Sequence, residues 1–281
     1  MSERSERTIE HSEATTTARI VAVARRDLVH ETSYHFALAL RFAQMLFVTT
    51  TLYFVSKLVT DTPELAPYGG RYFEFVVVGI IVASFVTLGL GAFSRSITDE
   101  QKAGTLEMLL VSATPVRTLL AGSLVVPFGM TLLNVLVYLT MASTLFGADL
   151  PIGGLLLAVP VLVLTVATFC AFGIFSASFI VLTKRGDPFT LFAAQASTFL
   201  AGTIFPTTVL PGALEALTRF VPAYYGLEAI RSVLLSDAGF GDIVGEMVVL
   251  VAFAVVLLPL SLLAFSRALR AARVTGTLGN Y

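Results

Sequence analysis

Hydrophobic residues run along this chain in six long segments that contain almost no charged side chains. Lys57, which can extend toward the membrane surface, is the only charged residue inside any of them. A helix that crosses a lipid bilayer needs about 20 apolar residues. The pattern therefore predicts six membrane-spanning helices, and tilt accommodates the longer third and fourth segments. The segments are 42–60, 75–94, 118–148, 150–183, 188–214 and 247–266.

Composition places the whole chain in the membrane class. Hydrophobic residues make up 56% of the chain and charged residues only 13%, whereas a soluble domain carries about 25% charged residues. The fold class is therefore an all-α integral membrane protein. The single cysteine, Cys170, lies inside a predicted span and is interpreted as a small packing residue.

The distribution of positive charge predicts the orientation of the spans. With six spans, both termini lie on the same side, and all but four of the 18 Lys and Arg residues fall on that side. Positively charged loops stay in the cytoplasm. We therefore expect both termini to be cytoplasmic in a multi-pass protein of the plasma membrane. The four exceptions are Lys57, Arg71, Arg219 and Arg231.

The N-terminal region divides into a tail and a helix. Residues 1–17 are polar and are predicted to form a disordered cytoplasmic tail. In residues 18–35, Ile20, Ala24 and Leu28 share one helical face, which favours an amphipathic helix at the membrane interface. The alternative is that this helix simply begins the first span. Residues 18–273 then form one six-span domain, followed by a cytoplasmic tail at 274–281.

The loop after the second segment predicts a short amphipathic helix on the cytoplasmic side. Thr98 and Gln101 fit a capping box, with Thr98 as the N-cap. The helix would present Leu106, Leu109 and Leu110 beside Glu107. An exposed apolar ridge of this kind generally meets a partner. A helix that only lies on lipid fits the pattern equally well.

A second feature follows the fifth segment, where Pro206 and Pro211 interrupt an apolar run. The chain beyond them predicts two short helices that dip into the outer leaflet. Glu228 and Arg231 stand three residues apart and can form an ion pair. The helices would act as an external gate or, alternatively, as a plug that seals the bundle. The candidate gate residues are Phe205, Pro206, Pro211, Pro222, Tyr224, Glu228 and Arg231.

Several kinds of chemistry are excluded by what the sequence lacks. The spans carry no Asp, Glu, Arg or His near their centres, which argues against a proton- or sodium-coupled carrier. There is no phosphate-binding loop, so any ATPase that drives transport must be another polypeptide. The spans contain no catalytic constellation, and the three histidines have no metal-ligand spacing, so we expect neither an enzyme nor a metal site.

These features in this order resemble the permease subunit of type 2 ATP-binding-cassette exporters. The resemblance rests on the lead helix, on the loop from Asp99 to Pro115, and on the late segment from Phe205 to Arg231. It covers the chain from about Arg19 to Arg273. It implies a homodimer of this chain with two copies of a separate ATPase, which would bind ATP and Mg. No cofactor on this chain and no nucleic-acid partner are expected.

The resemblance also implies roles for individual residues. The cytoplasmic helix would be the coupling helix that docks into the ATPase, and residues 18–35 would be the connecting helix. The second and fifth spans would face the transport pathway through Phe85, Thr87, Ser197, Thr198 and Phe199. The coupling residues would be Gly104, Thr105, Leu106, Glu107, Leu109 and Leu110.

The nature of the cargo stays open at this point. The 22 phenylalanines are scattered and tryptophan is absent, so no aromatic stripe suggests sugar stacking. A lipophilic or amphiphilic cargo such as a drug, a lipid or a lipid-linked glycan is favoured. Two alternatives remain: a non-transporting membrane scaffold or resistance subunit of an ATPase complex, and a secondary carrier.

Overall fold

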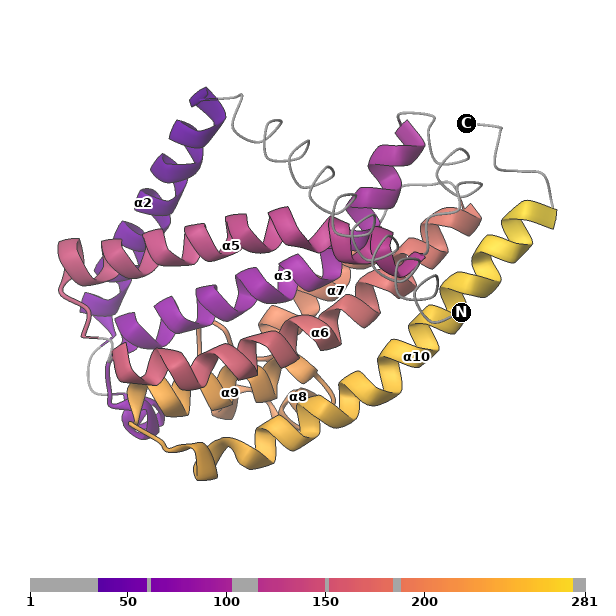
Figure 1. Cartoon of the computed structure of the whole chain (residues 1–281). Coiled ribbons are helices and arrows are strands. Elements are labelled where there is room, and N and C mark those ends of the chain that lie inside the picture. Colours follow the sequence, from indigo (N-terminus) through magenta and orange to yellow (C-terminus); the bar gives the residue numbers. More distant parts are fainter. Residues whose placement is uncertain (1–34, 60–61, 103–115, 150–151, 184–187, 275–281) are drawn as a thin grey trace, which may run out of the picture.

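The computed structural model describes residues 35–59, 62–102, 116–149, 152–183 and 188–274. The regular elements within these ranges are all helices (Figure 1). The α-helices are α2 (His35–Leu58), α3 (Tyr72–Lys102), α5 (Val116–Phe146), α6 (Ile152–Thr183), α7 (Pro188–Leu200), α8 (Gly212–Thr218), α9 (Pro222–Leu235) and α10 (Val244–Val274). Three short 3-10 helices join them: η1 (Pro63–Tyr68), η2 (Thr207–Val209) and η3 (Phe240–Ile243).

Four helices in the described ranges are long and apolar enough to cross a membrane. The all-α membrane class is therefore supported, whereas the predicted count of six spans is not confirmed. The first predicted span forms α2, which has 24 residues but contains three successive threonines and two cations. The fifth forms only the 13-residue helix α7. The four candidate spans are Tyr72–Lys102, Leu124–Phe146, Gly153–Thr183 and Phe240–Ala271.

Helices α3 and α6 cross with their backbones in contact because both carry glycine at the crossing. A Cβ added to Gly173 would lie 2.6 Å from the Gly89 carbonyl oxygen and 2.8 Å from that of Leu90. A Cβ added to Gly89 would lie 2.7 Å from the Phe169 Cβ. Small residues allow such close approach between membrane helices, where dispersion contacts drive association.

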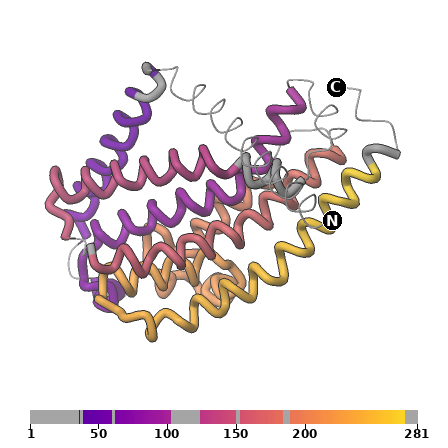
Figure 2. Tube along the Cα trace, viewed as in Figure 1, coloured from indigo at the N-terminus to yellow at the C-terminus, as the bar shows by residue number. Residues whose placement is uncertain are grey.

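Two further helices pack on α6. Gly226 of α9 lies against Thr165, and Gly154 of α6 lies against the Val233 carbonyl, so glycine again sets the separation. Helix α10 runs along α6, and the Thr168 hydroxyl donates to the Leu250 carbonyl across that contact at 3.3 Å. The backbone trace shows α3, α6 and α10 as successive layers of the bundle (Figure 2).

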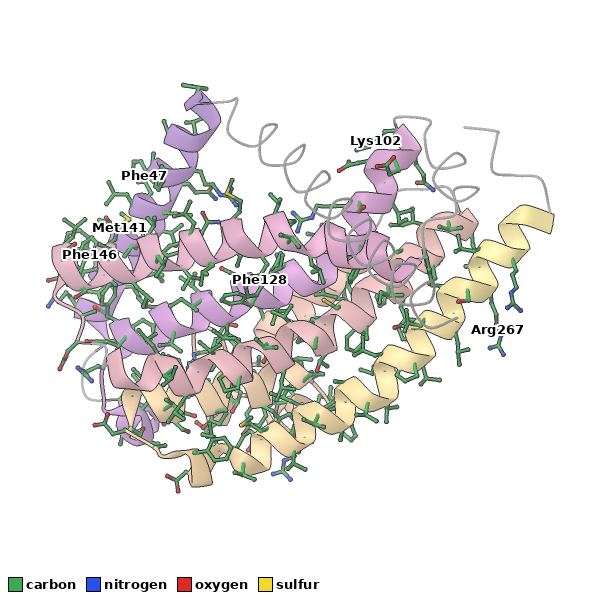
Figure 3. All side chains as sticks on the ribbon, viewed as in Figure 1. Phe47, Lys102, Phe128, Met141, Phe146 and Arg267 are labelled. Carbon is green, nitrogen blue, oxygen red and sulfur yellow. The ribbon has the colours of Figure 1, made fainter. Side chains whose placement is uncertain are left out.

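Helices α2 and α5 are attached more loosely. The most apolar stretch of α3 is 78% buried within the chain, whereas that of α5 is 11% buried. Aromatic side chains contribute to these contacts: Phe128 packs on Phe85, and Phe146 packs on Tyr53 and Phe73. Phe128 and Phe146 lie on α5, and α2 diverges steeply from it (Figure 3).

Helix α3, the second predicted span, extends beyond its charge-free run. Its extension makes the prediction of Thr98 as an N-cap wrong. Helix α3 continues from the predicted end near residue 94 through Arg95 and Thr98 to Lys102. The Thr98 hydroxyl donates to the Ser94 carbonyl at 2.8 Å, as a residue inside a helix does. Thr98 is therefore not an N-cap, because helical hydrogen bonding carries α3 past the first charged residues.

Candidate gate at one end of the bundle

Helix α7 ends in a tight reversal, which begins earlier than the prolines predicted. The helix stops at Leu200, and Gly202 has a φ of +70°, a left-handed conformation that glycine adopts without strain. A Cβ at Gly202 would lie 2.6 Å from the Phe205 carbonyl oxygen. The predicted break is thus confirmed, but Gly202 rather than Pro206 makes it.

The chain then forms two short helices, α8 and α9, as predicted. Their insertion into the outer leaflet stays a prediction. Pro206 is buried and precedes η2, and Pro211 is the N-cap of α8. The Phe205 ring packs edge-on against Phe199, with 5.4 Å between ring centroids. Pro222 begins α9 at a position where its missing amide is not needed. Residues 201–235 are called the gate segment below.

Helix α9 lies inside the bundle rather than on its surface. Leu227, Ile230 and Leu234 are buried, and Tyr224 is half-buried. These residues are three or four positions apart and so share one face of the helix. Helices α3, α6 and α10 all contact α9. Helix α9 is therefore part of the packed core at this end of the molecule.

Arg231 is the largest fully buried side chain in the described part of the chain. Its guanidinium donates to three backbone carbonyls, at 3.0 Å to Gly202, 2.8 Å to Thr203 and 3.2 Å to Phe75. Its central carbon also lies 3.4 Å from the centroid of the Phe75 ring, in a cation–π contact. Arg231 therefore joins α9 to both the reversal after α7 and the first turn of α3.

Glu228 does not form the predicted ion pair with Arg231. Both residues lie in the described part of the chain, and the Glu228 carboxylate instead accepts hydrogen bonds from the Tyr68 hydroxyl at 2.9 and 3.0 Å. The prediction failed because the sequence spacing of an ion pair does not reveal tertiary partners. Tyr68 belongs to η1, so this bond ties α9 to the stretch that leads into α3.

Burial dominates the electrostatics of this cluster. Burial raises the pKa of Glu228, while the hydrogen bond from Tyr68 and the charge of Arg231 oppose that shift. Burial lowers the pKa of the Arg231 guanidinium to about 9, against the effects of Tyr68 and Glu228. The guanidinium therefore remains charged at neutral pH and keeps all its donors.

Comparison with known proteins decides the family. The family described as "ABC-2 type transporter" matches residues 20–235, which include α3, α5, α6, α7 and the gate segment. This chain is an ABC-2 type permease. It is 27% identical over 190 residues to the protein named "Inner membrane transport permease YadH" of Escherichia coli K12, covering 66% of this chain and 72% of that protein. The proteins of that name in Escherichia coli O157:H7 and Shigella flexneri match to the same extent.

Membership in this family makes the chain a transport subunit embedded in a membrane, as the sequence predicted. The match and the apolar helices agree on this point. ABC-2 permeases belong to transporters whose ATPase is an ATP-binding-cassette protein, so the family indicates such a partner in general terms. The family therefore indicates a transport subunit rather than a catalytic one.

The predicted pathway residues are distributed over different environments in the permease. Phe85 is 1% exposed and lies between α3 and α5. Thr87 is exposed on α3, and Phe199 is 49% exposed on α7. Ser197 and Thr198 are half-buried on α7. Thr87 and Phe199 are thus exposed on the surface of the chain, whereas Phe85 is buried. The role of all five residues in transport stays a prediction.

The coupling residues Gly104, Thr105, Leu106, Glu107, Leu109 and Leu110 lie outside the described residues, as does most of the predicted connecting helix at 18–35. Tyr68, Gly79 and Gly202 complete the cluster around Arg231. Sequence reasoning missed Tyr68 and Gly79, and it assigned the break in the chain to the prolines rather than to Gly202. A signal existed only for Gly202, because a glycine inside an apolar run can mark a turn.

Proposed function

We propose that this permease exports a lipophilic or amphiphilic substrate, using ATP that a separate ATPase subunit hydrolyses with Mg. The observation that carries the proposal is the absence of charge from the central part of the spans: residues 75–94, 124–146, 153–183 and 247–266 contain no Asp, Glu, Lys, Arg or His. A path between such helices suits an apolar cargo and offers no relay for protons or ions.

The proposed assembly is a homodimer of this chain with two copies of the ATPase, in the inner membrane where the named relatives are found. Both termini and the loop 103–115 would face the cytoplasm, and the gate segment would face outside. The excess of Lys and Arg on the side of the termini supports this orientation.

In the proposed cycle, ATP closes the ATPase dimer and displaces the coupling residues Gly104–Leu110. Because α3 continues without interruption to Lys102, a push on the following loop would act directly on that helix. Movement of α3 and α7 would then open an outward path at the gate segment. Coupling of this kind requires that the loop has different contacts in the two states.

The test is purification of the permease from its native membrane in mild detergent, followed by mass spectrometry of bound proteins. We expect an ATP-binding-cassette ATPase in equal amount, and its loss when Leu106 and Leu109 are both replaced by Asp. Thr114→Asp is the matched control, since it adds charge to the same stretch at the residue before Pro115, where we expect Asp to serve as the N-cap of the helix that follows.

Two outcomes would contradict the proposal. A permease that purifies alone under these conditions would favour an autonomous carrier. An ATPase that binds but whose hydrolysis is insensitive to Leu109→Pro, a change that should break the coupling helix, would favour a non-transporting scaffold.

A further inference from the structure

The guanidinium of Arg231 is held by carbonyl groups of two separate elements. A buried charge is unfavourable unless hydrogen bonds replace the lost water. Here the replacements come from Gly202 and Thr203, after the last turn of α7, and from Phe75 in the first turn of α3. Carbonyls just beyond a helix end lack helical amide partners, so the arginine satisfies groups that would otherwise be unpaired.

Gly79 provides a second, independent feature of the same contact. A Cβ at this position would overlap the Thr203 carbonyl and would lie 3.1 Å from the Arg231 Nη2. The reversal after α7 therefore rests directly on the backbone of α3. Only glycine at position 79 permits that approach, which brings the Thr203 carbonyl within reach of the arginine.

Three more hydrogen bonds tie the gate segment and its flank to the entry of α3. The Tyr68 hydroxyl donates to Glu228, the Tyr72 hydroxyl donates to the Ile204 carbonyl at 3.0 Å, and the Ser236 hydroxyl donates to the Pro67 carbonyl at 2.7 Å. The first turn of α7 is held as well. The Thr190 hydroxyl of α7 lies 2.9 Å from the Ser176 oxygen of α6 and 3.4 Å from the Ser94 oxygen of α3.

We propose that Arg231 is a clamp that fixes the gate segment to α3, so that the two move together as one body. The gate segment does not hinge open at Gly202; it is carried by α3. All contacts of the clamp lie within one chain, so the clamp does not depend on the proposed function. Only its role at an exit gate rests on that function. Arg231 is thus a positioning residue that links movement of a long span to the end of the bundle.

The test is hydrogen–deuterium exchange of the full chain in lipid nanodiscs, without ATPase or cargo, so its result is independent of the exporter proposal. In the unmodified chain, we expect the amides of 201–205 to open with the same free energy as the first turns of α3. In Arg231→Met, we expect exchange at 201–205 to accelerate by roughly ten- to a hundredfold, since buried bonds from a charged donor are lost.

Three variants make the test specific. Gly79→Ala should accelerate exchange at 201–205 although Arg231 is intact, because the reversal is pushed off α3. Arg231→Lys should give an intermediate effect, since one ammonium cannot reproduce the planar fork of donors. Arg219→Met is the matched control, because Arg219 is an exposed arginine of the same segment, and it should change nothing.

Spin labels test the single body directly. In a Cys170→Ala background, labels at Thr87 of α3 and Thr208 of the gate segment, both exposed, would report their separation. Dilution with unlabelled chain restricts the signal to pairs within one molecule. A narrow distribution that broadens in Gly79→Ala supports the clamp.

The proposal is overturned if exchange at 201–205 is unchanged in Gly79→Ala and Arg231→Lys. It is also overturned if the unmodified chain opens at 201–205 far more easily than at the start of α3. If Arg231→Met does not accumulate in the membrane, exchange at 201–205 in Gly79→Ala, in Arg231→Lys and in the unmodified chain still decides whether the clamp exists.

Discussion

Helices α3 and α5 have the same length of 31 residues and lie side by side, yet the chain holds them in very different ways. Glycines bring the backbone of α3 against α6 and against the reversal after α7. Helix α5 instead meets α3 through aromatic rings such as Phe128 and leaves most of its surface uncovered. One part of the molecule is fixed by backbone contact, and the other by side chains.

The difference indicates where the permease can change shape. Lipid tails are as apolar as leucine, so close packing and hydrogen bonds decide which helices stay together in a membrane. Helices α3, α6, α7 and α9 share both kinds of contact, and α10 joins them along α6. Helices α2 and α5 share few such contacts. We therefore expect rearrangement between these two parts rather than within the first.

The largest effect is expected from Gly173→Leu, which should break the crossing of α3 and α6. Even a Cβ at this position would lie 2.6 Å from a backbone oxygen that cannot move away alone. The two helices must then separate, and we expect little or no folded protein. Yield after size-exclusion chromatography in mild detergent is the measurement.

Gly129→Leu on α5 is the control for that change. A Cβ at Gly129 meets nothing within 4 Å, and the position is exposed. Leucine favours a helix over glycine by about 0.5–1 kcal/mol, so this variant should be as stable as the parent or slightly more so. If the yield of folded protein fell equally in both variants, the packing of α3 and of α5 would not differ as argued.

The second prediction concerns Phe85, where the two parts meet. Phe85→Ala removes a buried ring between α3 and α5 and should lower the free energy of unfolding by about 3–5 kcal/mol. Thermal unfolding in detergent measures this loss. Thr87→Ala, on the exposed side of the same helix, should leave it almost unchanged.

Phe85→Ala also tests the pathway prediction. If Phe85 only packs α3 against α5, the unfolding temperature falls and Phe85→Leu restores much of it. Full stability in Phe85→Ala together with altered transport would instead make Phe85 part of the pathway.

The sequence predicted the long helices because lipid imposes a simple rule on composition. Charge-free runs located α3, α5, α6 and α10, since a charged residue inside a span is costly. The same rule misplaced their ends. Helix α3 passes Arg95 to reach Lys102, because a helix that leaves the membrane keeps its hydrogen bonds.

The candidate site was only half predictable, for a different reason. Helices α8 and α9 follow from Pro211 and Pro222, whose local effects are fixed by their rings. The partners of Arg231 are backbone carbonyls on elements up to 156 residues away in sequence. Carbonyls are present at every residue, so no sequence pattern marks the three that Arg231 binds.

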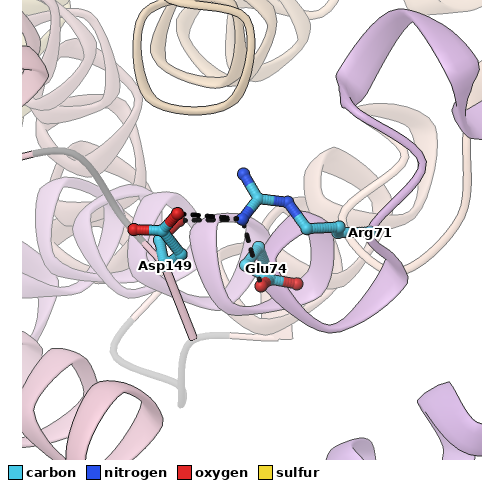
Figure 4. A network of polar contacts seen from close by, with 3 residues as sticks. All are labelled: Arg71, Glu74 and Asp149. Carbon is cyan, nitrogen blue, oxygen red and sulfur yellow. Dashed lines mark hydrogen bonds and ion pairs between the residues drawn. The ribbon is translucent and has the colours of Figure 1, made fainter. Parts of the chain in front are cut away.

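The smallest effect is expected at an exposed link between the two parts. Arg71, just before α3, lies 3.6 Å from both the Glu74 and Asp149 carboxylates, and it donates to the Asp149 carbonyl at 3.3 Å (Figure 4). Asp149 follows α5, and its side chain is 90% exposed. Exposed ion pairs contribute at most about 1 kcal/mol.

Asp149→Asn should therefore lower the free energy of unfolding by less than Phe85→Ala does. High salt should abolish the difference in stability between Asp149→Asn and the parent, because salt screens exposed charges. Thermal unfolding at low and high ionic strength measures both. The backbone bond from Arg71 to the Asp149 carbonyl survives the substitution, which limits the loss further. A large loss that persists in salt would mean that this link, rather than the aromatic contacts at Phe85, attaches α5 to α3.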